Sequence, residues 1–292
     1  MIVIGADAGG TKTAAGVWKD GELVARANGA PGAVRPGRAL AAASAIIDAC
    51  RTALSSARIA RGDWLVVGAA GVGRTAERDE LSQALRSEGV CDRVKVVTDI
   101  ELVLASAFGD GPGIALAAGT GSIAVLRNAD GTLLRSGGHG WQMGDEGSGY
   151  AIARAALAAV SRAQDGRGPA TVLSAALPGA ARVPDFDALV SWATSATPVQ
   201  VASLAPAVLG AAGDAVADEI VTVAANELAM LVTSLRSRVT STESLPLAFA
   251  GSVAAQDAYR ARVKSALSSV SGITVRDGVV DPLGGVPRLA GG

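Results

Sequence analysis

The chain opens with MIVIGADAGGTKT, residues 1–13, in which a short apolar run ends at a carboxylate and two glycines follow. Ile2-Val3-Ile4 is β-branched and short, which suits a buried strand. Gly9 and Gly10 permit a tight turn whose backbone N–H groups can approach an anion closely. The stretch therefore predicts a phosphate-binding loop at the end of the first strand.

The residues around this turn decide between three phosphate-binding designs. The spacing of Gly5 and Gly10 resembles a Walker A loop, but Thr11 precedes the lysine and no helix-forming segment follows. Instead, the pair Asp20-Gly21 separates two apolar stretches, which predicts a β-hairpin. A glycine turn that joins strand to strand excludes both a Walker A loop and a Rossmann opening. We therefore expect a β-hairpin whose turn holds phosphate.

The composition of the chain limits its class and its partners. A length of 292 residues suffices for two domains of ordinary size, each with its own core. A net charge of -1 gives no electrostatic reason to expect nucleic acid or an acidic membrane as a partner. Apolar stretches are interrupted well short of a membrane span, and no basic region precedes the first apolar residues. We therefore expect a cytoplasmic protein without a nucleic-acid or membrane partner.

The two cysteines, Cys50 and Cys91, lie in unrelated contexts and form no C-x-x-C pair. Their spacing therefore indicates neither a disulfide scaffold nor a zinc site. We expect both side chains to be buried apolar residues.

Residues 113–135, GIALAAGTGSIAVLRNADGTLLR, repeat the plan of the N-terminus. An apolar strand meets a Gly-Thr turn at 119–122, a second strand follows, and an Asp-Gly turn at 130–131 leads to a third. Two such copies predict two domains of similar topology that face each other across a cleft, each with one phosphate-binding hairpin. The alternative is a pair of unrelated β-hairpins.

The pattern between and after the copies is that of an α/β protein, with alanine-rich helices packed on strands of valine and isoleucine. We place an N-terminal domain at 1–112 and a C-terminal domain at 113–292, with the last helix a candidate to return to the first domain. Hydrophobic periodicity predicts helices at residues 39–54, 77–86, 151–162 and 215–238, and strands at 64–67, 94–97, 247–250 and 273–275.

Five short motifs complete the pattern, in the order AGGTKT (8–13), VTD (97–99), AGTGS (118–122), GDEGS (144–148) and AGS (250–252). Together they resemble the N-acetylglucosamine kinase branch, or BadF/BadG/BcrA/BcrD ATPase family, of the superfamily of actin, heat-shock chaperones and sugar kinases. The resemblance implies two actin-like (ribonuclease H-like) α/β domains, with sugar and phosphate on the first and nucleotide on the second. It also implies an ATP- and Mg²⁺-dependent kinase of an amino sugar such as N-acetylglucosamine, glucosamine or N-acetylmuramic acid. We further expect a homodimer.

The resemblance assigns residues to the nucleotide and to the metal. Asp7 would orient Mg²⁺ or its waters, and the first turn would contact the β- and γ-phosphates of ATP. Lys12 is either a phosphate ligand or a solvent-exposed side chain on the strand that leaves the turn. The AGS segment resembles the place where adenosine lies, although Ser252 also suits a helix N-cap. The implied nucleotide-binding residues are Gly9, Gly10, Thr11, Lys12, Gly119, Thr120, Gly121, Gly251 and Ser252.

Asp99 follows a predicted strand and opens a predicted helix, which is where α/β proteins collect catalytic groups. Aspartate is also a preferred helix N-cap, worth about 0.5–2 kcal/mol relative to alanine, so the residues alone leave a structural role open. In the family that the chain resembles, the aspartate of this Thr-Asp pair accepts the proton of the sugar hydroxyl during phosphoryl transfer. The resemblance therefore implies that Asp99 is the catalytic base.

The resemblance also implies a sugar pocket near the GDEGS motif. Asp145 would hydrogen-bond the sugar hydroxyls, in a pocket lined by Ser122, Gly138, His139 and Gly140. The alternative is that the two adjacent carboxylates of the motif simply favour the positive N-terminus of the following helix.

The chain departs from the family pattern at two sugar-binding positions. Ala33 lies near the place of an asparagine that contacts the sugar, and His139 stands where a tryptophan is frequent. The stretch around Ala33 instead carries Arg35 and Arg38, and a guanidinium can grip a carboxylate with two parallel hydrogen bonds. We therefore expect a sugar that carries or tolerates a negative group near these arginines. The alternative is that both arginines are solvated on an exposed loop.

Three other functions remain open. GVGRTA at 71–76 is a G-x-G-x-x-A that follows a predicted strand, and Asp99 could then bind a ribose, as in a dinucleotide-binding oxidoreductase. That interpretation leaves both Gly-Thr hairpins and GDEGS unexplained. A second alternative is an ATPase that activates a dehydratase through a shared iron–sulfur cluster, but Cys50 and Cys91 fall outside the loops where such a cluster would lie. A third is a sugar sensor without catalytic activity.

Overall fold

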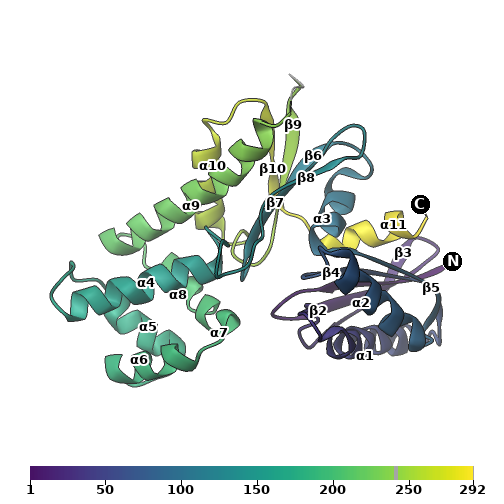
Figure 1. Ribbon diagram of the computed structural model, residues 1–292, viewed down its shortest axis with the longest axis horizontal. Coiled ribbons are helices and arrows are strands. Elements are labelled where there is room, and N and C mark those ends of the chain that lie inside the picture. The colour runs from purple at the N-terminus through teal and green to yellow at the C-terminus, as the bar shows by residue number, and fades with distance from the viewer. Residues whose placement is uncertain (240–242, 292) are drawn as a thin grey trace. The chain divides into compact units, whose positions relative to one another are not determined.

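The computed structural model describes residues 1–239 and 243–291, and the chain divides into two compact units (Figure 1). Unit 1 contains Met1–Gly111 together with the chain from Val280 onward, and unit 2 contains Pro112–Val279. Each unit is built on one sheet of five strands. Within the described residues, no helix has the length and apolar character needed to cross a membrane.

The sheet of unit 1 begins with the predicted hairpin. Its strands are β1 (Ile2–Ala8), β2 (Thr13–Lys19), β3 (Glu22–Gly29), β4 (Gly62–Ala69) and β5 (Cys91–Thr98), in the order β3-β2-β1-β4-β5. β1, β2 and β3 form an antiparallel meander, whereas β4 and β5 continue the sheet parallel to β1. This mixed order contradicts the dinucleotide-binding alternative, because a Rossmann sheet opens with parallel strands.

Alternation along the strands gives each face of this sheet its own core. Ile4, Ala6 and Ala8 of β1 are buried against the face that carries α1 (Ala39–Ala57) and α2 (Thr75–Ser87). Val3 and Val66 point to the other face, which is covered by α3 (Asp99–Phe108), the 3₁₀ helix η1 (Pro282–Gly285) and α11 (Val286–Ala290). The last segments of the chain therefore cover a face of unit 1.

The sheet of unit 2 repeats the same plan, as the sequence predicts. Its strands are β6 (Gly113–Ala118), β7 (Ser122–Arg127), β8 (Leu133–Gly137), β9 (Leu245–Ala250) and β10 (Ile273–Val279), in the order β10-β9-β6-β7-β8. β6, β7 and β8 form the meander, and β9 and β10 run parallel to β6. Because two sheets share one order and one pattern of strand directions, the alternative of two unrelated hairpins is wrong.

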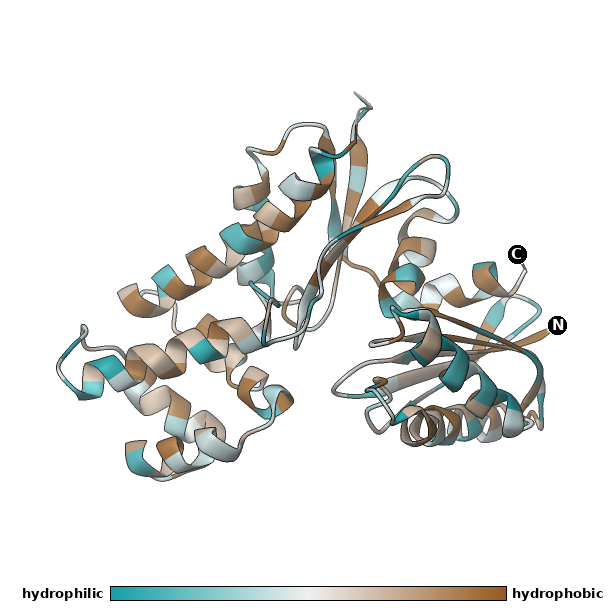
Figure 2. Ribbon diagram, in the orientation of Figure 1, coloured by the Kyte–Doolittle hydropathy of each residue, from teal (hydrophilic) through white to brown (hydrophobic). Residues whose placement is uncertain are grey.

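Unit 2 differs from unit 1 by a helical insertion after its meander. The inserted helices are α4 (Gly149–Gln164), α5 (Leu173–Ala181), α6 (Phe186–Ser195), α7 (Pro198–Ala202) and α8 (Ala205–Leu209). They are followed by α9 (Ala215–Arg236) and, beyond β9, by α10 (Asp257–Leu267). Apolar and polar residues alternate along α9 (Figure 2), and its buried residues join α4, α8 and α10 in one core with the sheet.

The predicted helices and strands are all present, with ends that differ by a few residues. The strand predicted at 64–67 extends to Gly62–Ala69, and the helix predicted at 215–238 ends at Arg236. The two cysteines are free and buried, as predicted for apolar residues. Burial raises the pKa of the Cys50 thiol to about 12, which makes it an inert group at neutral pH.

Candidate functional site

The first Gly-Thr turn, residues 9–12, is an open connection between two antiparallel strands. Ala8 pairs with Thr13, and within the turn the backbone N–H of Gly9 donates to the carbonyl of Lys12 at 3.0 Å. Gly10 and Lys12 are exposed, and a β-carbon built on Gly10 would meet no atom within 4 Å. The turn therefore presents accessible backbone, with one exposed lysine beside it.

Asp7 and Asp99 are brought to the same edge of the unit 1 sheet. Asp7 pairs with Gly68 of β4, Gly68 pairs with Val97 of β5, and Asp99 starts α3 just beyond the end of β5. A β-carbon on Gly68 would lie 2.3 Å from a methyl carbon of Leu102 and 3.4 Å from the Cα of Asp99. Asp7 and Val97 are thus separated by two strand spacings, about 10 Å, and Asp99 lies two residues beyond Val97. The glycine between them lets α3 pack closely on β4.

Burial and nearby negative charge raise the pKa of both of these carboxyl groups. Burial raises the pKa of Asp7 to about 7, helped by the charges of Asp99 and Asp281 and opposed by Lys12. Burial also raises the pKa of Asp99, although the backbone N–H of Ile100 donates to its Oδ1 at 2.9 Å and favours the ionised form. A bound cation would relieve this crowding of negative charge.

Mg²⁺ fits these groups. Within the described residues, no three histidine, cysteine, aspartate or glutamate side chains are grouped as a complete protein cage for a metal. Mg²⁺ does not need such a cage, because proteins commonly hold it with one or two carboxylates while waters and substrate phosphates complete the shell. Asp7, beside the open turn, is suited to that role.

Asp281 is a neighbour that the sequence did not reveal. It belongs to the segment of unit 1 that follows β10, and its Oδ2 accepts a hydrogen bond from Nη2 of Arg26 at 2.5 Å. Its Oδ1 accepts from the backbone N–H of Leu283 at 3.1 Å. Only the return of the chain to unit 1 places its charge near Asp7, so no local motif could have marked it.

Asp99 is not the cap of its helix. Thr98 is the N-cap of α3, and Glu101 completes a capping box by accepting from the backbone N–H of Thr98 at 2.8 Å. The structural interpretation of Asp99 as an N-cap is therefore wrong. Thr98 and Glu101 do that work, and the Asp99 carboxylate accepts from the N–H of Ile100 through Oδ1.

The arginine-bearing loop, residues 31–38, lies against the first turn. The backbone N–H of Ala33 donates to the carbonyl of Gly9 at 3.2 Å, and that of Val34 donates to the carbonyl of Ala70 at 2.8 Å. Arg35 and Arg38 are exposed. The family resemblance implies that this loop lies near the sugar, and these hydrogen bonds place its backbone beside the first Gly-Thr turn.

The first glycine of the G-x-G-x-x-A stretch has a packing role. Gly71 has a φ of +88°, and a β-carbon there would come within 2.0 Å of the carbonyl oxygen of Val34. Glycine is therefore needed at this position so that two loops can meet, and not for the approach of a dinucleotide.

The second Gly-Thr turn, residues 119–121, is fixed from several sides by backbone hydrogen bonds. The N–H of Gly119 donates to the carbonyl of Gly121 at 2.9 Å. The first N–H groups of α4, from Gly149 and Tyr150, donate to the carbonyls of Gly119 at 2.8 Å and Thr120 at 3.3 Å. The start of α4 therefore holds this turn, unlike the open turn of unit 1.

Gly251 and Ser252 lie directly beside the second turn. Gly251 has a φ of +94°, and a β-carbon there would lie 2.4 Å from the carbonyl oxygen of Ala118. A β-carbon on Gly119 would lie 3.8 Å from Oγ of Ser252. The alternative role of Ser252 as a helix N-cap is wrong, because α10 begins at Asp257 and its N-cap is Gln256.

Asp145 is held against the second turn in an unusual backbone conformation. Its φ is +63°, which is rare for a residue other than glycine, and its Oδ1 accepts from the backbone N–H of Ser122 at 3.1 Å. Oγ of Ser122 in turn donates to the carbonyl of Glu146 at 2.6 Å. Burial raises the pKa of Asp145, and the bond from Ser122 opposes that shift. The N-cap of α4 is Ser148, so Asp145 does not cap that helix.

The segment before Asp145 supplies the other predicted sugar-pocket residues. Gly138 and Gly140 have φ values of +70° and +86°. His139 is exposed, with its Nδ1 3.0 Å from Nη2 of Arg135. Trp141, which sequence analysis did not single out, is 44% exposed and its ring centroid lies 5.4 Å from that of Tyr150.

The predicted site residues therefore form two clusters, one in each unit. Unit 1 brings the open turn, Asp7 and Asp99 to one sheet edge. Unit 2 brings the fixed turn, the Gly251–Ser252 segment and Asp145 together through hydrogen bonds and close contacts of a few ångströms. One cluster carries two carboxylates, and the other carries backbone, hydroxyls and one carboxylate.

Two curated relatives match part of the chain. An N-acetylmuramic acid/N-acetylglucosamine kinase from Clostridium acetobutylicum is 35% identical over 172 residues, which is 58% of this chain and 56% of the relative. An N-acetyl-D-glucosamine kinase from Dictyostelium discoideum is 34% identical over 146 residues, 48% of this chain and 46% of the relative. The chain thus spans about half the length of the curated relatives it matches.

A solved structure matches almost the whole chain. It is that of a candidate N-acetylglucosamine kinase from Chromobacterium violaceum, with a TM-score of 0.81, 28% identity, and coverage of 99% of this chain and 98% of the other. This likeness confirms the expected α/β fold of actin-like domains. The family model for the BadF/BadG/BcrA/BcrD ATPases matches residues 4–285, and the chain therefore belongs to the BadF/BadG/BcrA/BcrD ATPase family.

Proposed function

We propose that the protein is an ATP-dependent kinase that transfers a phosphoryl group to a hydroxyl of an amino sugar. The observation that carries this proposal is the placement of Asp99, free of a capping role, on the same sheet edge as Asp7 and the open Gly-Thr turn. A base, a metal-orienting carboxylate and exposed backbone N–H groups are the parts that phosphoryl transfer uses. The names of the relatives support an amino sugar as acceptor.

In this proposal, unit 1 supplies the base and part of the phosphate site. Asp99, in its ionised form, accepts the proton of the attacking hydroxyl, and partial burial makes it a stronger base than an exposed aspartate. Gly9, Gly10 and Thr11 contact the phosphates, with the N–H of Gly9 already bonded to the carbonyl of Lys12 within the turn, and Lys12 adds a positive charge beside the turn. Asp7 holds Mg²⁺, which when bound neutralises charge on the phosphates.

Unit 2 supplies the remaining contacts in this proposal. The fixed turn at 119–121 binds phosphate, and the Gly251–Ser252 segment lies against the adenosine. Asp145 accepts hydrogen bonds from sugar hydroxyls, with Ser122, Gly138, His139 and Gly140 around it. The support is geometric, since hydrogen bonds and close contacts join the turn to Ser252 on one side and to Asp145 on the other.

We further propose that the sugar carries or tolerates a carboxylate, such as the lactyl group of N-acetylmuramic acid. The loop with Arg35 and Arg38 is hydrogen-bonded to Gly9, which keeps both exposed guanidinium groups on the loop next to the phosphate turn. A guanidinium can bind a carboxylate through two parallel hydrogen bonds. One of the relatives is named for both the acidic sugar and the neutral one.

A screen of amino sugars and simple hexoses, with ADP release as the signal, tests the function. We expect release to rise with N-acetylmuramic acid, N-acetylglucosamine or glucosamine, to need Mg²⁺, and to stay at background with ATP alone. Mass spectrometry of the sugar should show the added phosphate. Sugar and ATP binding without phosphate transfer would overturn the kinase in favour of a sugar sensor, and release that ignores every sugar would favour an ATPase activator.

A further inference from the structure

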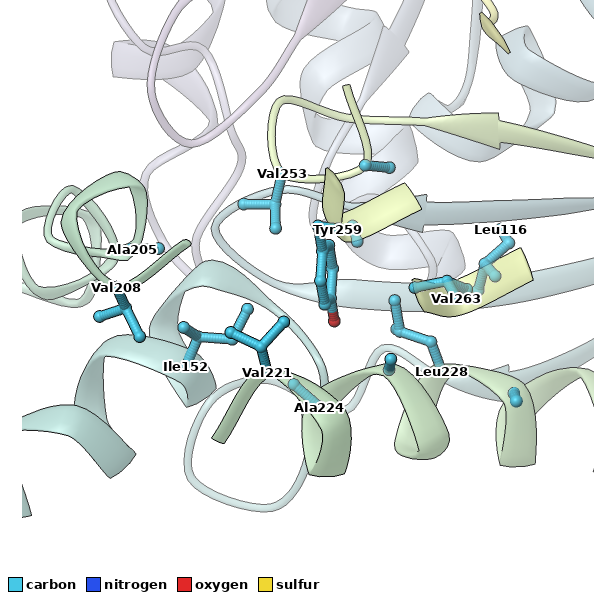
Figure 3. Packing of buried hydrophobic residues seen from close by; sticks show 14 of the residues in the cluster. Leu116, Ile152, Ala205, Val208, Val221, Ala224, Leu228, Val253, Tyr259 and Val263 are labelled. Carbon is cyan, nitrogen blue, oxygen red and sulfur yellow. The ribbon is translucent and has the colours of Figure 1, made fainter. Parts of the chain in front are cut away.

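Tyr259 is a fully buried polar side chain in the first turn of α10. Its exposed fraction is 0%, and its hydroxyl donates to the carbonyl of Gly147 at 2.6 Å. Figure 3 shows its ring between Val253 and Val263, with the hydroxyl directed toward Ala224 and Leu228. Burial raises the pKa of this phenol well above its usual range, so the hydroxyl remains a proton donor.

The partner of this hydroxyl lies in a tightly constrained loop. Gly147 has a φ of +74°, and a β-carbon there would come within 2.5 Å of both the carbonyl oxygen of Ala224 and Cγ of Leu228. It stands two residues after Asp145, whose φ is also positive. The loop that contains Gly147 therefore packs closely against α9 and accepts a hydrogen bond from Tyr259 of α10.

The other end of the connection is the segment beside the fixed turn. α10 follows Gly251 and Ser252 by a few residues, and the backbone N–H groups of Val253 and Ala254 both donate to the carbonyl of Ala118 at 3.0 Å. Tyr259 therefore joins the Gly251–Ser252 segment to the Asp145 loop through the core of unit 2. This route is separate from the one that runs through the hairpin and Ser122.

We propose that Tyr259 is a positioning residue that sets the orientation of Asp145 from the nucleotide-binding side of unit 2, an inference that rests on the proposed kinase function. The hydroxyl fixes the carbonyl of Gly147, and the constrained backbone carries that constraint to Asp145. Loss of the hydroxyl leaves a buried carbonyl without its partner, and the loop relaxes to satisfy it. We expect weaker sugar binding, whereas Val253 and Ala254, which follow Ser252, keep their own hydrogen bonds to Ala118 of β6.

The test compares Tyr259→Phe with Val263→Ala. The first removes only the hydroxyl, and the second removes two methyl groups from the same helix and core and leaves the hydrogen bond to Gly147 in place. For Tyr259→Phe we expect the KM for the sugar to rise about fivefold to thirtyfold, as for a lost buried hydrogen bond, while the KM for ATP changes by less than about twofold. For Val263→Ala we expect a lower melting temperature and an unchanged ratio of the two KM values.

Hydrogen exchange of the backbone separates this proposal from the kinase function itself. We expect amides in residues 145–149 to exchange faster in Tyr259→Phe than in wild type or in Val263→Ala. If wild type phosphorylates no sugar, the kinase function fails and the exchange result alone decides the positioning role. Equal exchange in the two variants, or equal rises of both KM values in Tyr259→Phe, would overturn the role of Tyr259 even in an active kinase.

Discussion

The two Gly-Thr turns occupy the same place in two sheets of the same order, yet their surroundings are opposite. A β-carbon on Gly10 of the first turn would meet no atom within 4 Å, whereas one on Gly121 of the second would lie 2.8 Å from both carboxylate oxygens of Asp145. The first turn has open space around its glycine, and the second is closed in by a loop and the start of a helix.

The difference comes from what the chain places after each meander. In unit 1 a single loop and α1 follow β3, and the sheet edge keeps two crowded carboxylates, Asp7 and Asp99. In unit 2 the helical insertion begins directly beside the turn, and its first N–H groups hydrogen-bond the turn carbonyls. A duplicated topology thus supplies a turn at a fixed place, while later contacts decide whether that turn is an open binding surface or a rigid support.

The largest effect should come from removing the proposed base. Asp99→Asn should lower kcat by about 10²–10⁴ and leave ATP affinity near normal, because general-base catalysis acts on the transition state. Steady-state kinetics and ATP titration check this. Stability should not fall, because Thr98 and Glu101 cap the helix and burial already disfavours the charge of Asp99.

A matched control for this variant is Asp110→Asn, an exposed aspartate of the same unit, which should keep wild-type kinetics. Asp145→Asn should instead raise the KM for the sugar, since its carboxylate belongs to the second cluster. A drop in kcat below about tenfold for Asp99→Asn, outside the usual range for general-base catalysis, would remove Asp99 from the chemistry. The contrast between the two clusters would then need another explanation.

The next effect concerns Asp7 and the dependence of stability on pH. The pKa of Asp7 is raised from 3.8 to about 7 in the folded protein, so the folded state binds this proton more tightly than the unfolded state. The resulting stability is fully present below pH 3.8 and is lost as the pH rises through about 7. Asp7→Asn should therefore gain stability relative to wild type at pH 8, by about 2–4 kcal/mol.

Urea unfolding of both proteins at pH 5 and pH 8 measures this difference, and Asp110→Asn again serves as the control. Millimolar Mg²⁺ should stabilise wild type at pH 8 more than Asp7→Asn, because the cation offsets the charge that crowds Asp7. Equal pH profiles for wild type and Asp7→Asn would show that the folded carboxyl titrates normally.

A pair of alanine substitutions tests the open and closed turns directly. Gly121→Ala should push Asp145 away, destabilise the fold by about 1–3 kcal/mol as overpacking does, and raise the KM for the sugar. Gly10→Ala should change stability by less than about 0.5 kcal/mol and act on the KM for ATP. Thermal melts and the KM values for sugar and ATP measure the difference between the two turns. Equal losses of stability in the two variants would contradict it.

The smallest effect should come from the arginine-bearing loop. Arg35→Ala or Arg38→Ala should lower kcat/KM for N-acetylmuramic acid relative to N-acetylglucosamine by about threefold to tenfold, as expected for a partly exposed charge pair. Arg58 is the C-cap of α1, at the other end of that helix from the loop. Arg58→Ala is therefore a control for the loss of one positive charge. An unchanged ratio in both loop variants would mean that the arginines do not select the substrate.

Much of this architecture could be predicted from local signals. The Asp-Gly pairs and β-branched runs predict the meanders because turn chemistry and strand periodicity act over a few residues. The two Gly-Thr turns, the strand before Asp99 and the glycine-rich loop before α4 are local in the same sense. The candidate residues in both clusters belong to motifs that a short stretch of chain can carry, so the sequence is enough to predict them.

Other features depend on residues that are far apart in the sequence, and only the tertiary structure decided them. The charge of Asp281 reaches Asp7 because the chain returns to unit 1, Gly68 is required by Leu102 of a helix beyond the next strand, and Tyr259 finds Gly147 across 112 residues. Burial and long-range charge set the pKa of Asp7, and neither is encoded in its neighbours. The sequence by itself determined where the chemical groups stand along the strands, and packing determined which of them are crowded, fixed or left open.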